Sequence, residues 1–160
     1  MFKQALIRHR TFNLTVTILT IVYALIMIRL LFLRGGQWED YNYNLIPLKT
    51  ISIYITERDS LSFNVWFTNI FGNIVLFIPI GWAVPVLFRR FLKFLPFCLL
   101  VIGVIFLVEL IQMLTRVGSF DVDDIILNTF GASIGFVITR IVTRFFFHKR
   151  SAANISAKRM

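Results

Sequence analysis

The chain has 160 residues, enough for a single domain, and 58% of them are hydrophobic while only 16% are charged. The mean hydropathy is +0.78 and the apolar residues come in long blocks, which excludes a soluble domain and indicates an integral membrane protein. The net charge of +9 could suggest a nucleic-acid partner, but the placement of the basic residues argues against one. The basic residues stand at the ends of the apolar blocks, where they set topology and contact lipid headgroups.

The cysteine and histidine residues argue against a disulfide and against a zinc site. Cys98 is the single cysteine, so no intrachain disulfide can form, and His9 and His148 lie too far apart in sequence to suggest a zinc cluster. The first apolar run, residues 14–33, is longer than the core of a signal peptide, and no small-residue cleavage site follows it. We therefore expect an uncleaved first membrane helix.

Four apolar blocks are each long enough to cross a hydrocarbon core of roughly 30 Å, which takes about 20 helical residues. The predicted fold is all-α: a bundle of four transmembrane helices forming one domain over residues 1–160. The helices are expected at residues 13–33, 65–88, 94–115 and 122–147. A disordered basic tail is expected to follow at residues 148–160.

The Lys and Arg residues predict the orientation. Eleven of them stand in the N-terminus, in the turn between the second and third helices, and in the C-terminal stretch from Arg144 onward, whereas the two loops on the other side carry four. Because positive residues accumulate on the cytoplasmic side, both termini are expected in the cytoplasm, with a long first outer loop over residues 34–64.

The outer loop contains aromatic residues suited to the headgroup region. In it Ile51, Ile53 and Ile55 alternate with polar or aromatic residues, which predicts a short strand or an extended segment on the membrane surface. Ser62 or Asn64 is expected to cap the second helix.

The start of the fourth helix carries a polar stripe. Asp121, Asp124, Asn128, Gly131 and Gly135 are spaced by three or four residues, which places them on one helical face. A stripe of this kind on an apolar helix needs polar neighbours. Two aspartates could simply cap the helix and suit its dipole, but three together with an acid nearby exceed that role.

Two other helices supply such neighbours. In the predicted orientation Asn69 and Asn73 lie at the outer start of the second helix. Glu109, Gln112 and Arg116 lie at the outer end of the third, continuing the apolar face of residues 98, 102 and 105. These groups all fall within roughly 12 Å of the outer boundary, so the sequence predicts a polar site at outer-leaflet depth.

Glu109 is the strongest single candidate for a functional residue. A carboxylate at membrane depth costs about 2.5–3.5 kcal/mol on insertion scales, so it should face the bundle, and Arg116 is a candidate partner. A buried ion pair or polar contact between helices is the competing interpretation, and amide contacts of about 0.6–2 kcal/mol could also explain the asparagines and Gln112.

Small residues and prolines are assigned to helix packing, at Gly72, Pro79, Gly81, Gly131 and Gly135. Pro79 should kink the second helix, because it removes a backbone donor. The spacing of Gly131 and Gly135 would also serve a homodimer.

The predicted cluster is rich in oxygen ligands. It could hold a divalent cation such as Mg²⁺ or Ca²⁺ through Glu109, Asp121 and Asp124. It could equally bind a cationic group, or relay protons through Glu109. The complete predicted ligand-binding set is Asn44, Asn69, Asn73, Glu109, Gln112, Arg116, Asp121, Asp123, Asp124 and Asn128, with Glu109 and Asp124 as catalytic candidates if a reaction occurs.

Several motifs in this order resemble the VanZ-like family of small membrane proteins. They are the stretch Asn44-Leu45-Ile46-Pro47, the run N-x-x-G-N-x-x-x-F-x-P-x-G over residues 69–81, E-x-x-Q with Arg116 over residues 109–116, and D-x-x-D-x-x-x-N-x-x-G-x-x-x-G over residues 121–135. The resemblance implies a membrane protein associated with resistance to the lipoglycopeptide teicoplanin. It carries over no molecular mechanism.

Three functions remain open. The first is an accessory protein that binds an amphiphile, with membrane lipids, a lipid-linked envelope precursor or a lipoglycopeptide as partners. The second is a metal-dependent enzyme acting on a lipid headgroup or envelope polymer. The third is a small proton-coupled carrier or an assembly factor.

Overall fold

The computed structural model describes residues 2–33 and 38–157, and the side chains of residues 10–33 and 38–143. Within this part of the chain the structure is almost entirely helical, and four helical stretches are long and apolar enough to cross a membrane. They are Arg10–Phe32, Phe63–Leu87, Phe94–Leu114 and Val122–Thr143. Helices of this length and composition satisfy their backbone groups internally, as hydrocarbon requires, which indicates a helical membrane protein.

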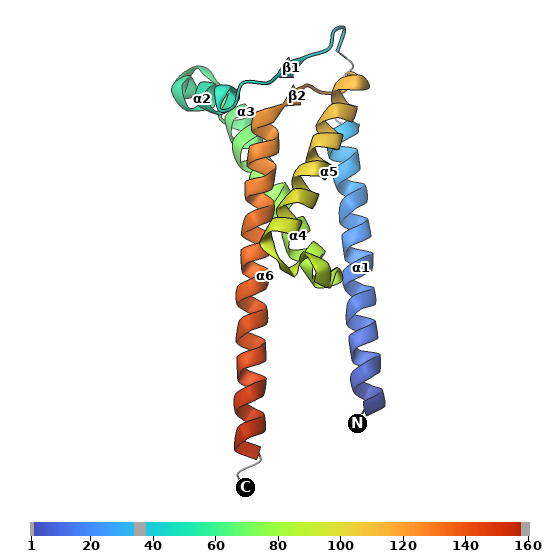
Figure 1. Cartoon of the computed structure of the whole chain (residues 1–160). Helices are drawn as coiled ribbons and strands as arrows, with labels where there is room; N and C mark the ends of the chain where they lie inside the picture. Colours follow the sequence, from blue (N-terminus) through green and yellow to red (C-terminus); the bar gives the residue numbers. More distant parts are fainter. Residues whose placement is uncertain (1, 34–37, 158–160) are drawn as a thin grey trace.

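The helices run lengthwise side by side (Figure 1). The first helix, α1, is Phe2–Phe32. The second stretch consists of α3 (Phe63–Phe67), a π-helical turn η2 (Thr68–Gly72) and α4 (Asn73–Leu87). A 3₁₀ turn, η3 (Arg89–Leu92), then leads into α5 (Phe94–Leu114), and α6 spans Val122–Ala157.

The helix irregularity in the second stretch lies at η2, more than one turn before the expected kink at Pro79. Pro79 is contained within α4 and is exposed. Ser62 caps the stretch, since its side chain accepts a hydrogen bond of 3.4 Å from the backbone N–H of Val65.

Two expectations about local structure are wrong. The isoleucine-rich segment is helical, forming α2 (Lys49–Thr56), and is followed by a 3₁₀ turn, η1 (Arg58–Ser60). The fourth long helix also continues to Ala157, ten residues past its expected end, so the segment expected to be a disordered tail is helical as far as it is described. Residues 158–160 lie outside the described part.

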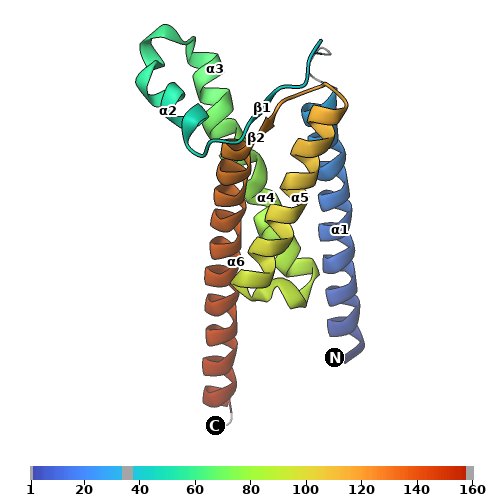
Figure 2. The same cartoon turned by 45° about the horizontal axis from the view of Figure 1, so that its top comes forward.

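Close backbone packing joins α4 to α6 (Figure 2). A Cβ atom on Gly131 would lie 2.0 Å from the carbonyl oxygen of Ile74, and one on Gly135 would lie equally close to that of Ile78. A Cβ atom on Gly81 would likewise lie 1.9 Å from the carbonyl oxygen of Ala132. The missing side chains thus let the two backbones touch within one chain. Gly72 takes no part in this contact, because a Cβ there would meet only a side chain of its own helix.

The hydrophobic core is completed by the inner face of α5. Its buried residues Phe97, Val101, Ile105 and Glu109 recur every four positions, and Phe97 packs on Phe136 of α6 at a ring distance of 4.7 Å. The expected face through residues 98, 102 and 105 is thus turned by about one position, and Ile102 is exposed. Glu109 continues this buried apolar stripe.

The segment that holds α2 and the loop between α5 and α6 lie at the end of the bundle opposite to the first turns of α1 and the last turns of α6 (Figure 1). Two short strands, β1 (Tyr43–Asn44) and β2 (Phe120–Asp121), pair there in parallel, with Asn44 opposite Asp121. Helix α2 lies beside them, above the start of α6. Glu109 and the aspartates at the start of α6 lie at this end of the bundle.

Candidate functional site

Three aspartates stand at the entrance to α6, and Glu109 reaches the same region from α5. The backbone N–H of Asp121 donates a hydrogen bond of 3.3 Å to Glu109 Oε2, which joins the two elements directly. Glu109 is 3% exposed and Asp123 is fully buried. We call Glu109, Asp121, Asp123 and Asp124 the acidic cluster.

Asp121 is occupied in holding the outer loop. Its Oδ1 accepts hydrogen bonds from Asn44 Nδ2 at 3.0 Å and from the backbone N–H of Asp123 at 2.8 Å. Its Oδ2 accepts from the hydroxyl of Thr50, on α2, at 2.7 Å. Both carboxylate oxygens are therefore engaged in tying β1 and α2 to the head of α6.

Asp123 has a comparable role. Its Oδ1 accepts a hydrogen bond of 2.5 Å from the backbone N–H of Leu48, and its Oδ2 accepts one of 3.1 Å from that of Ile51. These are first-turn N–H groups of α2, which have no partner inside a helix. A carboxylate more than seventy positions later in the chain thus caps α2, and its negative charge suits the positive end of that helix.

Glu109 and Asp124 are the two members with oxygens left over. Asp124 Oδ1 accepts a hydrogen bond of 2.6 Å from Asn73 Nδ2, and Glu109 accepts the single long bond from the Asp121 backbone. The second oxygen of each carboxylate accepts no hydrogen bond from any described residue. These two groups, together with Asn73, form the part of the cluster that can take a ligand.

Asn128 lies one turn after Asp124 on the same face of α6. It is 3% exposed, and its Oδ1 has no hydrogen-bond partner among the described residues. A buried carbonyl oxygen left without a donor costs about 1–3 kcal/mol, so it is a further acceptor that a bound donor could satisfy.

Three of the predicted ligand-binding residues, Asn69, Gln112 and Arg116, have their contacts outside the acidic cluster. Asn69 Nδ2 donates to the Val65 carbonyl within its own helix, at 2.7 Å. Gln112 Nε2 donates to the Leu31 carbonyl of α1 at 2.8 Å, and so acts as a contact between helices.

Arg116 does not pair with Glu109. Helix α5 ends at Leu114, and Arg116 has a φ of 59°, so helical spacing no longer places it on the Glu109 face. Its guanidinium instead lies 4.7 Å from the centre of the Tyr41 ring. No salt bridge to the acidic cluster is found in the described part of the chain, which leaves the cluster without a cationic partner.

Sequence reasoning missed two neighbours of the cluster on α2, Thr50 and Tyr54. Burial raises the pKa of the Tyr54 hydroxyl above its ordinary value, and the nearby carboxylates of Asp124 and Asp121 raise it further. Together with Ile51 these residues form a half-buried stripe with helical spacing. The alternating isoleucines concealed that stripe.

The described residues contain no group of three or more His, Cys, Asp or Glu side chains placed to share a metal ion. Glu109, Asp121 and Asp124 are accordingly not placed as three ligands of one ion in this structure. Both carboxylate oxygens of Asp121 already accept hydrogen bonds, from Asn44, Thr50 and the Asp123 backbone.

Comparison with known proteins identifies the family. The profile described as VanZ/LLP1 matches residues 17–143, most of the chain. The chain belongs to the VanZ/LLP1 family. This confirms the resemblance drawn from the spaced motifs.

A curated relative in the VanZ/LLP1 family is Protein VanZ of Enterococcus faecium, which is 33% identical over 69 residues. That match spans 43% of this chain and 42% of the relative, so the chain covers less than half the length of the curated protein it matches. No solved structure gives a significant match.

Proposed function

We propose that this VanZ/LLP1 protein is an accessory membrane protein in resistance to lipoglycopeptides such as teicoplanin, or in maintenance of the cell envelope. In this proposal Glu109 and Asp124 bind an amphiphilic ligand at outer-leaflet depth. The family match and the similarity to Protein VanZ support the proposed role in resistance or envelope maintenance. The acidic cluster supports the binding role.

One observation carries the proposal. Carboxylates from two different helices converge with an unoccupied oxygen each, and no Lys or Arg in the described part of the chain forms a salt bridge with them. Charges held at membrane depth without a partner are costly, and they mark functional sites more often than structural ones. We infer that a ligand supplies the missing partner.

The available groups define the chemistry of that ligand. The oxygens left over on Glu109, Asp124 and Asn128 are all acceptors. A ligand that binds the ionised carboxylates must therefore present donors: an ammonium group, or hydroxyl and amide N–H groups. An amphiphile that lies in the outer leaflet with such a polar head would meet this requirement, as a lipid-linked envelope precursor or an acylated glycopeptide would.

A metal-dependent enzyme is the weaker alternative. It would need a third ligand beside Glu109 and Asp124, and no third His, Cys, Asp or Glu side chain of the described residues is placed to share an ion with them. The carrier alternative has no observation of its own in its favour.

The test removes one charge at a time without changing side-chain size. Glu109→Gln and Asp124→Asn should each abolish protection against teicoplanin in cells expressing the full chain, with membrane expression and thermal stability retained. Glu57→Gln is the matched control, because Glu57 is an exposed acid at the end of α2 outside the cluster. Unchanged protection in both cluster variants would overturn the proposal.

A second arm separates the two ligand sources. Binding of teicoplanin to the purified protein, measured by isothermal titration in detergent, should weaken at least tenfold in both variants if the drug is the ligand. If the wild-type protein binds no drug but the variants still lose protection in cells, the ligand is a component of the envelope.

A further inference from the structure

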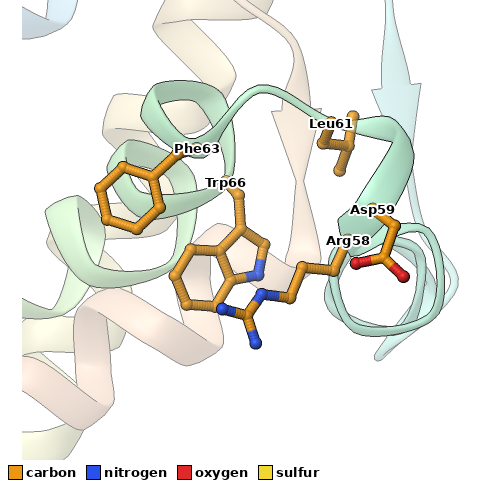
Figure 3. Close-up of a pocket in the computed structure, with 5 residues that line it drawn as sticks. All are labelled: Arg58, Asp59, Leu61, Phe63 and Trp66. Carbon is orange, nitrogen blue, oxygen red and sulfur yellow. The ribbon is translucent and has the colours of Figure 1, made fainter.

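A second polar feature lies away from the acidic cluster, where the outer loop enters the second long helix. A pocket of about 100 Å³ opens between η1 and α3, and Figure 3 shows its lining. The five lining residues are Arg58, Asp59, Leu61, Phe63 and Trp66. The pocket stands at the start of the apolar stretch Phe63–Leu87, which is the boundary between headgroups and hydrocarbon if that stretch spans the bilayer.

The pocket holds a positive and a negative group that do not neutralise each other. The Arg58 guanidinium lies 4.9 Å from the centre of the Trp66 ring. The Asp59 carboxylate lies on the other side of the Arg58 stem (Figure 3). No salt bridge or hydrogen bond of either side chain to any described residue is found, so both charges are available to a ligand.

An aromatic wall continues from the pocket along the helix. Phe63, Phe67 and Phe71 recur every four residues, with stacked rings at 5.6 Å and 5.1 Å. They are 65%, 46% and 40% exposed, and Trp66 contacts Phe71 edge-on. This face is turned away from the helix bundle, so in a bilayer it adjoins lipid chains.

We propose that the pocket binds the headgroup of a zwitterionic phospholipid that carries a primary ammonium group, such as phosphatidylethanolamine. The phosphate pairs with the Arg58 guanidinium and the Trp66 indole N–H, and the ammonium pairs with Asp59. One acyl chain follows the rings of Phe63, Phe67 and Phe71. The assignment uses neither Glu109 nor Asp124 and does not depend on the proposed function.

The side-chain chemistry favours this headgroup over others. A guanidinium offers a fork of donors that fits phosphate oxygens, and its stacking on an aromatic ring fixes its orientation. An anionic lipid such as phosphatidylglycerol would satisfy Arg58 but would bring no cation to Asp59. Phosphatidylcholine would bring a cation with no N–H to donate.

The experiment uses the full chain with Trp38 and Trp82 changed to Phe, so that Trp66 is the remaining tryptophan. Quenching of its fluorescence by lipids brominated on the acyl chain, in vesicles of mixed composition, reports which lipid lies beside it. We expect phosphatidylethanolamine to be preferred over phosphatidylglycerol and phosphatidylcholine by about threefold to fivefold, the effect of one partly exposed charge pair.

Two variants divide the two contacts. Arg58→Gln should weaken the binding of all three phospholipids, whereas Asp59→Asn should leave phosphatidylglycerol binding unchanged or stronger and remove the preference for phosphatidylethanolamine. Lys49→Gln and Glu57→Gln are the matched controls, because they change charges on the same loop outside the pocket lining. They should leave the preference intact.

Equal quenching by the three lipids in the protein with native Arg58 and Asp59 would overturn the proposal, as would a preference that survives Asp59→Asn. If the tryptophan replacements impair folding, native mass spectrometry of lipids retained by the purified chain supplies the same comparison. Dimers without retained lipid, with Arg58 and Asp59 at their interface, would also contradict it.

Discussion

The aspartates at the head of α6 have nearly the same sequence environment but different tasks. Asp123 caps α2, and Asp121 anchors β1 and the Thr50 hydroxyl. Asp124 keeps one oxygen beyond its bond to Asn73. Asp121 stands on β2, before α6 begins, whereas Asp123 and Asp124 are adjacent positions in the first turn of α6 and point about 100° apart. Asp121 and Asp123 therefore hold the outer loop in place, and Asp124 is left as a candidate ligand-binding residue.

The cap can be tested with Asp123→Asn. An asparagine offers one oxygen where two backbone N–H groups are now accepted, so one donor of Leu48 or Ile51 loses its acceptor. We expect a loss of about 1–3 kcal/mol in stability, concentrated in α2. Hydrogen exchange of the amides of residues 48–52 should accelerate markedly.

Asp40→Asn is the control for this measurement, since Asp40 is an exposed acid of the same loop. Exchange rates in α2 that do not change in Asp123→Asn would show that the carboxylate does not hold this helix.

At the level of whole helices, the contact between α4 and α6 depends on atoms that are missing. Gly81, Gly131 and Gly135 bring backbone carbonyls to distances that no Cβ could tolerate. In hydrocarbon, association of helices relies on such close packing, because the surrounding lipid is as apolar as the side chains. The contact also positions Asn73 of α4 against Asp124 of α6. Packing and site geometry are thus linked.

We predict that Gly131→Ala destabilises the fold by about 1–3 kcal/mol or more, because its Cβ would meet the Ile74 carbonyl. Gly103→Ala provides a matched control on α5. A Cβ there meets nothing within 4 Å, so the change should be neutral or stabilising by up to about 1 kcal/mol. Thermal unfolding in detergent measures both variants. Similar melting temperatures for the two would contradict the packing argument.

Across the whole molecule, the acidic cluster, α2 and the paired strands gather at one end of the bundle, and the first turns of α1 and the last turns of α6 extend from the other (Figure 1). The basic residues Arg89, Arg90 and Lys93 lie in the turn between α4 and α5, away from the cluster. This charge asymmetry motivates the proposal that the cluster faces outward.

Single-cysteine labelling tests the orientation. In a Cys98→Ala background, Ser60→Cys should react with a membrane-impermeant maleimide added to intact cells, because Ser60 is exposed in η1, shortly after α2. Arg90→Cys should react only after permeabilisation. The reverse labelling pattern would show the opposite orientation and would contradict an acidic cluster at outer-leaflet depth.

Much of the architecture could be read from the sequence. Four largely apolar blocks, each more than twenty residues long, predicted four long helices, which the structure confirms, because a chain in hydrocarbon must satisfy its backbone groups internally. The spaced motifs predicted the family, which the profile match confirms. Helical spacing and a shared depth predicted that Asn73, Glu109 and Asp124 lie in one region. In the structure Asn73 donates a hydrogen bond to Asp124, and Glu109 accepts one from the backbone of Asp121.

Tertiary structure decided what each polar residue does. The segment with alternating isoleucines became a helix because Asp123, far along the chain, satisfies its first N–H groups. Arg116 left the Glu109 face because α5 ends before it. Local pattern determines how a segment buries apolar surface, but the partners of a buried polar group depend on which distant atoms arrive beside it.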